Sequence, residues 1–141
     1  MAGGAFTDFS GTYEPVGSEG YAAFLAAIGV DEATREVLAA DPQGVRITQE
    51  GDQYTFRSTV AGKESVLRFT LGQEFIADYG YGDDRRAKGI ARRDGNRIVL
   101  RRKSGEVEST DVYTVDDEGN FGTALIGPNG VSATRSHKRS S

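Results

Sequence analysis

Two side chains near the carboxyl end of the chain have the chemistry and spacing to bind an anion. Arg135 and His137 are separated by one residue in a predicted strand over residues 131–137, so period-2 alternation places both on one face. On an inner face, a guanidinium can hold a carboxylate through a bidentate fork, and an imidazole can add a hydrogen bond. The alternatives are that Arg135 forms a salt bridge with an internal acid, and that His137 is an ordinary surface residue.

A third candidate cation, Arg102, follows Ile98 and Leu100 at two-residue intervals. If these two apolar side chains face a core, Arg102 also faces inward and can help to hold the same anion. A one-residue deletion in the turn that follows would reverse its orientation, because a slip of one position moves every side chain of a strand to the other face. Both orientations of Arg102 therefore stay open.

The composition offers little for catalysis. The chain has one His and no Cys, which excludes a thiol nucleophile and a cysteine-based metal site. No Ser-His-Asp arrangement or metal-ligand spacing is present, so we predict no enzyme, no cofactor and no metal site. A catalytic carboxylate pair is the one arrangement that the sequence does not exclude. Residues 116–120 are acidic but lack the spaced ligands and closing Glu of a calcium loop, and are interpreted as a turn.

Nothing in the sequence predicts secretion or membrane insertion. The first residues lack the basic start and apolar run of a signal peptide, and no apolar run approaches the ~20 residues that span a bilayer. The absence of Cys fits a reducing compartment. A soluble protein of the cytosol is expected.

The charge is unevenly distributed along the chain. Residues 85–103 contain nine Lys or Arg and one acid, a local charge of +8 in a chain of net charge −4. Strand alternation places five of these cations on the outer face of a hairpin: Arg86, Lys88, Arg92, Arg97 and Arg101. This face is interpreted either as a solvated surface or as a docking site for anionic lipid headgroups. The lack of interleaved aromatic residues argues against nucleic acid.

Two short helices are predicted near the start of the chain. Residues 9–16 alternate loosely as a first strand, which Pro15 breaks near its end. The helices follow over residues 18–41, where the apolar positions recur with the helical period. Ser18 is the predicted N-cap of the first helix and Asp31 that of the second.

The rest of the chain has the two-residue period of strands. From Val45 onward, short alternating segments are separated by turn signals such as the Asp-Gly-Asn of residues 94–96. About ten strands in an up-and-down meander leave two exposed edges, which closure into a barrel removes. A barrel of ten strands is wider than side chains alone fill. We therefore predict an all-β single domain over residues 1–141 whose interior holds a ligand or water and whose mouth is covered by the helices.

Several short motifs follow one another in a fixed order along the chain. They are Phe9-Ser-Gly-Thr-Tyr13, Glu19-Gly-Tyr21, Phe24-Leu25, Ile28-Gly-Val30, Ala33-Thr-Arg35, Gly51-Asp52, Phe69-Thr-Leu-Gly-Gln-Glu-Phe75, Asp83-Asp-Arg85, Lys88-Gly-Ile90 and Thr134-Arg135. In this order the chain resembles the intracellular lipid-binding proteins, the family of fatty acid-binding and cellular retinoid-binding proteins. Tyr13 replaces the Trp of the family's Phe-x-Gly-x-Trp start. The resemblance covers roughly residues 7–139.

The resemblance implies a fold and a function. The fold is a ten-stranded up-and-down antiparallel β-barrel of the calycin type, capped by a helix-turn-helix lid after the first strand. The function is that of a carrier that holds one long-chain fatty acid or similar amphipathic lipid inside the barrel and performs no chemistry. We expect it to be a cytoplasmic monomer, and exchange of its lipid at an anionic membrane surface follows if the outer basic face is a docking site. Besides Arg135, His137 and Arg102, the expected ligand site is formed by Tyr21, Phe24, Phe56, Ser58, Phe69, Phe75 and Leu100.

Departures from the family pattern bear on the ligand. Many members hold a lipid carboxylate with an Arg-x-Tyr on the last strand and a second arginine. Here the last strand has Arg135-Ser-His137, and matching without gaps puts the second arginine position at Val112, which cannot hold an anion. Arg102 is the candidate replacement. The incomplete anchor keeps three alternatives open: a retinoid carrier, a carrier of bile-salt-like ligands, and a structural or protective protein that reuses the barrel. A lipocalin is disfavoured because that family places its helix after the barrel.

Overall fold

The computed structural model describes residues 8–40, 43–60, 62–79, 81 and 85–140. The elements, in chain order, are β1 (Gly11–Glu19), α1 (Tyr21–Ala27), α2 (Glu32–Ala40), β2 (Val45–Glu50), β3 (Gln53–Val60), β4 (Lys63–Thr70), β5 (Phe75–Asp78), β6 (Arg86–Asp94), β7 (Arg97–Ser104), β8 (Val107–Val115), β9 (Phe121–Ile126), the 3₁₀ turn η1 (Pro128–Gly130) and β10 (Ser132–Arg139). The prediction of an all-β fold with two helices after the first strand is confirmed.

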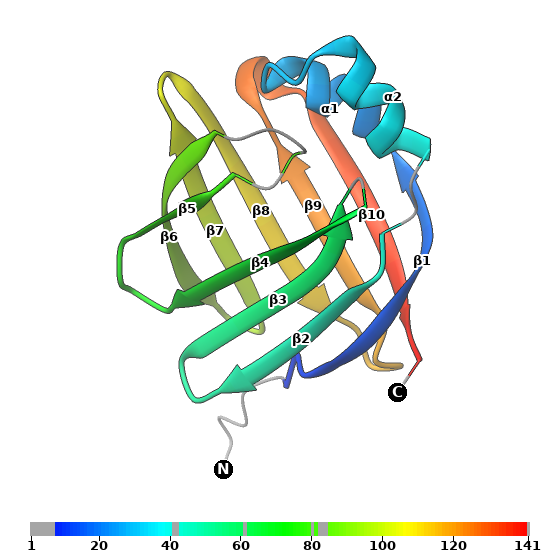
Figure 1. Cartoon of the computed structure of the whole chain (residues 1–141). Coiled ribbons are helices and arrows are strands. Elements are labelled where there is room, and N and C mark those ends of the chain that lie inside the picture. Colours follow the sequence, from blue (N-terminus) through cyan, green and yellow to red (C-terminus); the bar gives the residue numbers. More distant parts are fainter. Residues whose placement is uncertain (1–7, 41–42, 61, 80, 82–84, 141) are drawn as a thin grey trace.

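The ten strands form one antiparallel sheet that curls into a nearly closed barrel (Figure 1). The strand order is β4-β3-β2-β1-β10-β9-β8-β7-β6-β5, so β1 pairs with β10 and every other pair joins neighbours in sequence. Among the described residues no ladder joins β4 to β5. Instead, the turn between β4 and β5 contacts β6, where the Gly72 amide donates to Ala91 O at 2.8 Å. The stacked rings of Phe69 and Phe75, 6.1 Å apart, lie across this seam.

The first strand is longer than the sequence suggests. β1 does not stop at Pro15 but shifts register between Pro15 and Gly17 and stays paired with β10 as far as Glu19. A bulge accommodates a proline that a regular ladder would exclude. The predicted N-cap at Ser18 is therefore wrong, because Ser18 is still in the strand, opposite Arg135.

The two helices cover one end of the barrel (Figure 1). Gly20, with φ of 73°, reverses the chain out of β1 and precedes α1. The predicted apolar stripe of α1 is buried: Tyr21, Phe24 and Leu25 within the helix, and Ile28 directly after it. The predicted cap at Asp31 is confirmed, since its carboxylate accepts a hydrogen bond from the Thr34 amide at 2.8 Å. Residue 41, the predicted end of the helical segment, lies outside the described residues.

The buried apolar side chains form two clusters rather than one core. The cluster under the lid contains the apolar residues of α1 together with Leu38, Tyr79, Leu125 and Ala133. The second cluster fills the other end of the barrel with aromatic rings, among them Tyr54, Phe56, Phe69, Tyr113 and Phe121. Along the inner side of β9, Thr123 lies between Phe121 of one cluster and Leu125 of the other. On β9, a polar side chain thus separates the two clusters.

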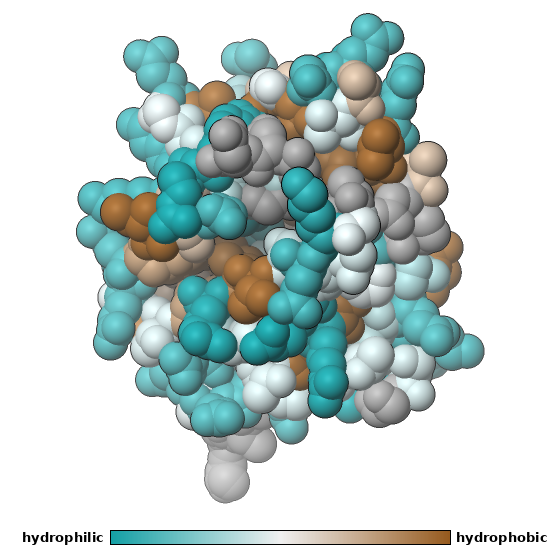
Figure 2. Space-filling view, viewed as in Figure 1, coloured by the Kyte–Doolittle hydropathy of each residue, from teal (hydrophilic) through white to brown (hydrophobic). Residues whose placement is uncertain are grey.

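The outer surface is mainly hydrophilic on the face shown in Figure 2, with separate apolar areas. The large apolar side chains exposed among the described residues are Val16, Val37, Val66, Ile76 and Ile126. Among the described residues, no helix has the length and apolar character to cross a bilayer.

Candidate functional site

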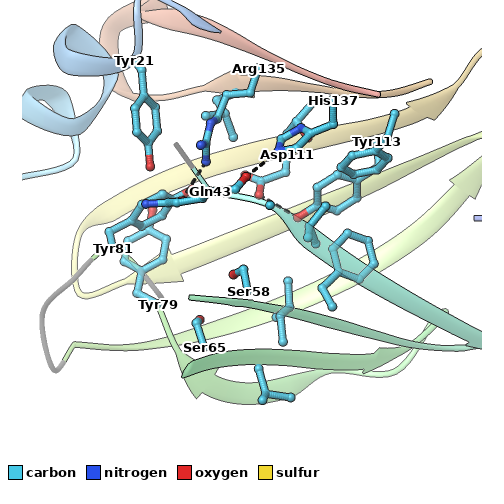
Figure 3. Close-up of a pocket in the computed structure, with 18 of the residues that line it drawn as sticks. Tyr21, Gln43, Ser58, Ser65, Tyr79, Tyr81, Asp111, Tyr113, Arg135 and His137 are labelled. Atoms are coloured by element: carbon cyan, nitrogen blue, oxygen red, sulfur yellow. Dashed lines mark hydrogen bonds between the residues drawn. The ribbon is translucent and has the colours of Figure 1, made fainter. Parts of the chain in front are cut away.

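A cavity of about 130 Å³ lies inside the barrel, and the side chains of α1 and of strands from both halves of the sheet point into it (Figure 3). Six of the predicted ligand-site residues line it: Tyr21, Phe56, Ser58, Arg102, Arg135 and His137. The other four lie in the neighbouring apolar clusters, Phe24 under the lid and Phe69, Phe75 and Leu100 at the other end of the barrel. The polar residues that strand alternation predicted to face inward therefore line one cavity.

Arg135 extends into this cavity from β10. Its guanidinium donates to Gln43 Oε1 at 3.0 Å and stacks over the ring of Tyr21 at 4.5 Å from the centroid. No acid forms an ion pair with Arg135 among the described residues. The guanidinium thus keeps both its charge and most of its N–H groups available, which is what binding a carboxylate requires.

His137 lies on the same strand face as Arg135 and is buried. Its Nε2 is 2.7 Å from Gln43 O, and because a carbonyl oxygen only accepts, Nε2 is the donor. Burial lowers the pKa of His137, the hydrogen bond to Gln43 opposes this, and the charge of Arg135 lowers the pKa further. At neutral pH the ring is therefore uncharged and Nδ1 is an acceptor.

Arg102 faces inward from β7, as the alternation with Ile98 and Leu100 predicted. Its guanidinium donates to Asp111 Oδ2 at 2.8 Å, to Tyr79 O at 2.9 Å and to Tyr81 Oη at 3.1 Å. It also lies over the rings of Tyr79 and Tyr81. Arg102, and not Arg135, thus forms the salt bridge to an internal acid. This salt bridge leaves Arg102 less able to hold an anion.

The Arg102–Asp111 ion pair belongs to a network of buried hydroxyl groups. Tyr113 donates to Asp111 Oδ2 at 2.8 Å, and Tyr79 is hydrogen-bonded to Ser109. Burial raises the pKa of Tyr113 well above its ordinary value, and the charge of Asp111 raises it further. Burial lowers the pKa of Arg102, but the attraction of Asp111 more than reverses this, so the pKa is raised overall. Arg102 is therefore charged at neutral pH, beside a neutral tyrosine.

The strand register shows which residue of β8 lies in the barrel near the position matched to the family's second arginine. Val112 points outward from β8 and is half-buried, whereas its neighbour Asp111 points into the barrel opposite Leu100. The motif match without gaps missed this acid by one residue. A usable signal was present, because Arg102 pairs with Ser109 across the turn, which puts Asp111 diagonally next to an inward arginine.

Sequence analysis also missed Gln43, Tyr79 and Tyr81. Gln43 follows α2 and joins Arg135 to His137 through its side chain and its carbonyl. The two tyrosines come from the segment after β5 and contact Arg102. These three residues lie outside regular strands, where no period indicates which way a side chain points.

The outward cations of residues 85–103 are exposed as predicted, but several have acidic partners. Arg86 pairs with Asp78 at 2.9 Å, Lys88 with Glu74 at 3.4 Å and Arg97 with Asp94 at 2.5 Å. Arg92 and Arg101 form no ion pair within the described part of the chain. The local positive charge is therefore smaller than a count over residues 85–103 suggests. No group of acids and His suited to a metal ion occurs among the described residues.

The fold and site agree with the similarities of the chain to known proteins. No family model matches. A fatty acid-binding protein of Tyrophagus putrescentiae is 29% identical over 130 residues, which cover 92% of this chain and 96% of that protein. Retinoid-binding protein 7 of Homo sapiens is 31% identical over 97 residues, 68% of this chain and 72% of that protein. The chain belongs to the family of fatty acid-binding and cellular retinoid-binding proteins.

Solved structures give the same assignment. A fatty acid-binding protein from the brain tissue of Drosophila melanogaster is 32% identical, with a TM-score of 0.81 over 93% of this chain and 99% of that one. A structure described as the REP1-NXSQ fatty acid transporter is 28% identical, with a TM-score of 0.86 over 95% and 97% of the two chains. The chain thus has the β-barrel fold of these relatives over 93–95% of its length.

Proposed function

We propose that this protein is a non-enzymatic, cytoplasmic carrier that binds one long-chain fatty acid or similar amphipathic lipid inside the barrel. The observation that carries the proposal is Arg135, an inward cation without an acid partner among the described residues, at a cavity between two apolar clusters. A carboxylate would satisfy Arg135, and an acyl chain would lie among the aromatic rings. The names of relatives, which include a fatty acid-binding protein and a fatty acid transporter, support this ligand class.

The size of the cavity sets a condition on binding. Its volume of about 130 Å³ is below the roughly 300–1,000 Å³ of typical ligand pockets. A long-chain lipid must therefore displace side chains, and the aromatic cluster is the part that can open. Phe56, for example, contacts Tyr113 with ring centroids 4.8 Å apart, and these rings move when a chain enters between them.

Calorimetry on delipidated protein tests the proposal. Saturable binding of one C16–C20 fatty acid per chain is expected, and the Arg135→Gln variant should weaken binding of the acid far more than binding of the matching alcohol. The expected loss is about 1.5–3 kcal/mol, the value of a hydrogen bond to a charged group. Equal losses for acid and alcohol would mean that the substitution only damages the barrel. Tight binding of an uncharged lipid, without binding of the acids, would contradict the fatty acid assignment.

A second candidate is a retinoid or bile-salt-like ligand. It is favoured by the salt bridge between Arg102 and Asp111, which leaves one cation instead of two for a carboxylate. Similarity to a human retinoid-binding protein agrees with it. Displacement of a bound fluorescent fatty acid by retinol or a bile salt at lower concentration than by fatty acid would favour this candidate. A barrel that takes up none of these lipids after delipidation would instead point to a structural or protective role.

We further propose that the outward cations of β6 and β7 speed exchange of the lipid with anionic membranes. Arg92 and Arg101 carry this effect, since neither has an ion-pair partner among the described residues. At ~1 kcal/mol for each basic residue close to the surface, the pair can orient an acidic protein within a Debye length of ~8–10 Å. The protein is expected to be a monomer during this transfer.

Transfer of a fluorescent lipid to anionic vesicles tests the docking proposal. The Arg92→Gln/Arg101→Gln variant should transfer more slowly and with less sensitivity to salt, at unchanged equilibrium affinity. The matched control is Arg86→Gln/Arg97→Gln, which removes two cations that already have acidic partners and should have a smaller effect. Unchanged transfer in both variants would make this face a solvated surface only.

A further inference from the structure

We propose that the lipid bound in the barrel carries a hydrogen-bond donor, a hydroxyl or an amide N–H, close to its anionic end. This inference rests on the proposed function, because it names what the same cavity selects. It follows from the kinds of polar atoms that the cavity leaves without partners.

Four buried polar atoms on cavity-lining side chains have no hydrogen-bond partner in the described structure. They are Gln43 Nε2, Arg102 Nε, Asp111 Oδ1 and His137 Nδ1. All four residues are more than nine-tenths buried. Buried polar groups are almost always paired, so four unpaired atoms around one cavity indicate that a polar guest joins them after small rotations of the side chains that cover them.

Two of these atoms are donors and two are acceptors. Arg102 Nε carries a hydrogen, and so does Gln43 Nε2, because Arg135 donates to the other amide atom, Oε1. Asp111 Oδ1 only accepts, and His137 Nδ1 accepts because Nε2 is the donor to Gln43 O. A plain carboxylate has no hydrogen to give. It can therefore satisfy the donors but leaves both acceptors unpaired.

The charges in the cavity lead to the same ligand class. The charge of Asp111 is offset by Arg102, 2.8 Å away, so the cavity has one cation without an acid partner in the described chain, Arg135. One anionic group fits this balance. The remaining need is a neutral donor for Asp111, which lines the same cavity as Arg135 (Figure 3). A fatty acid with a hydroxyl near its carboxylate meets both conditions in the simplest way, and an N-acyl amino acid does so with an amide.

Water is the competing partner for these atoms. A cavity of about 130 Å³ can hold several water molecules at ~30 Å³ each, and water both donates and accepts. If water stays when the lipid binds, the protein gains nothing from a hydroxyl on the ligand. A comparison of matched acids separates the two cases.

Calorimetry on the delipidated full chain provides the comparison. The ligands are hexadecanoic acid, its 3-hydroxy derivative and its 16-hydroxy derivative. The 3-hydroxy acid should bind about tenfold more tightly than the plain acid, which corresponds to ~1.4 kcal/mol. The 16-hydroxy acid should bind no better than the plain acid, because its hydroxyl enters the apolar part of the barrel.

Three variants locate the acceptor. Arg102→Met/Asp111→Leu removes the acceptor together with its counter-charge and should reduce the preference for the 3-hydroxy acid to about onefold, with the plain acid still bound. Tyr54→Phe is the matched control, since Tyr54 Oη is buried without a partner but lies outside the cavity, and its preference should equal that of the unmodified chain. Tyr113→Phe removes the donor to Asp111 Oδ2 and should increase the preference, which keeps the test decisive if the double variant does not fold.

The outcomes test the hydrogen-bond donor on the lipid separately from the proposed function. Saturable binding of the plain acid without a preference for the 3-hydroxy acid overturns this inference and leaves the proposed function standing. A preference that survives in the double variant, or that Tyr113→Phe leaves unchanged, also overturns it, because Asp111 is then not the acceptor. If none of the three acids binds, both the inference and the proposed function fail.

Discussion

Breaking the buried ion pair should cost more than removing it altogether. The side chains of Arg102 and Asp111 are 7% and 5% exposed, with 2.8 Å between their charged atoms. In Asp111→Asn the guanidinium stays buried without a counter-charge, a situation that typically costs about 3–5 kcal/mol. Arg102 keeps its hydrogen bonds to Tyr79 O and Tyr81 Oη, so we expect the lower end, about 3 kcal/mol.

The double variant gives the contrast. Arg102→Met/Asp111→Leu replaces both charges by apolar side chains of similar volume, and such replacements are often neutral or stabilising. Its free energy of unfolding should lie within about 1 kcal/mol of the unmodified chain. The losses of the single variants Arg102→Met and Asp111→Leu would then add up to far more than the loss in the double variant, as expected for residues in direct contact.

Urea unfolding, followed by tyrosine fluorescence and circular dichroism, measures these differences. Variants that keep the same m-value but shift the midpoint report a change in stability alone. A loss below about 1 kcal/mol in Asp111→Asn, or a double variant as unstable as the sum of the single variants, would refute the reasoning. The first result would mean that water reaches Arg102, and the second that the pair is needed for packing.

Three further predictions concern His137 and Gly20. Because burial lowers the pKa of His137, the unfolded chain binds more protons than the folded chain below pH ~6.5. The free energy of unfolding should therefore fall as the pH drops through that value and level off below the pKa of the folded state. His137→Gln should lose this slope in unfolding measurements between pH 5 and 8. Over the same range an anionic lipid, by favouring the protonated ring, should bind more tightly as the pH falls, with calorimetry as the check. Gly20→Ala should cost about 2 kcal/mol or more in urea unfolding, since φ is 73° and a Cβ would lie 2.8 Å from Ser132 O. The control Gly51→Ala, with φ of 59° and open space around it, should cost only the ~1 kcal/mol of the backbone conformation.

The sequence predicted the barrel because its periods are local. A two-residue alternation and a turn signal depend on neighbouring residues only, so about ten strands could be predicted directly, and alternation made inward directions for Arg102 and Arg135 candidates. Errors occurred where a distant contact decides the outcome. Pairing with β10 holds Ser18 in a strand, although its side chain is well suited to cap a helix.

The candidate site was predicted less completely than the fold. Its position on β7 and β10 followed from alternation, but the partner of Arg102 depends on the register between β7 and β8. A motif match without gaps assigned Val112 to the interior, whereas the pairing of Leu100 with Asp111 places an acid there. With Val112 in the interior, Arg102 and Arg135 would both lack an acid partner. With Asp111 there, Arg102 is paired, and Arg135 is the cavity-lining cation without an acid partner among the described residues.

The seam between β4 and β5 makes the barrel behave like a split ring. Elsewhere in the wall, separating two neighbouring strands breaks a row of backbone hydrogen bonds, at a net cost of about 1 kcal/mol each. At the seam, separation breaks the side-chain contact of Phe69 with Phe75 and the hydrogen bond from Gly72 to Ala91. The circumference can therefore widen in this one arc while the rest of the wall stays stiff. For a lipid bound inside the barrel as proposed, opening of the seam would add to the movement of the aromatic rings, and the small volume of the resting cavity would be no upper limit.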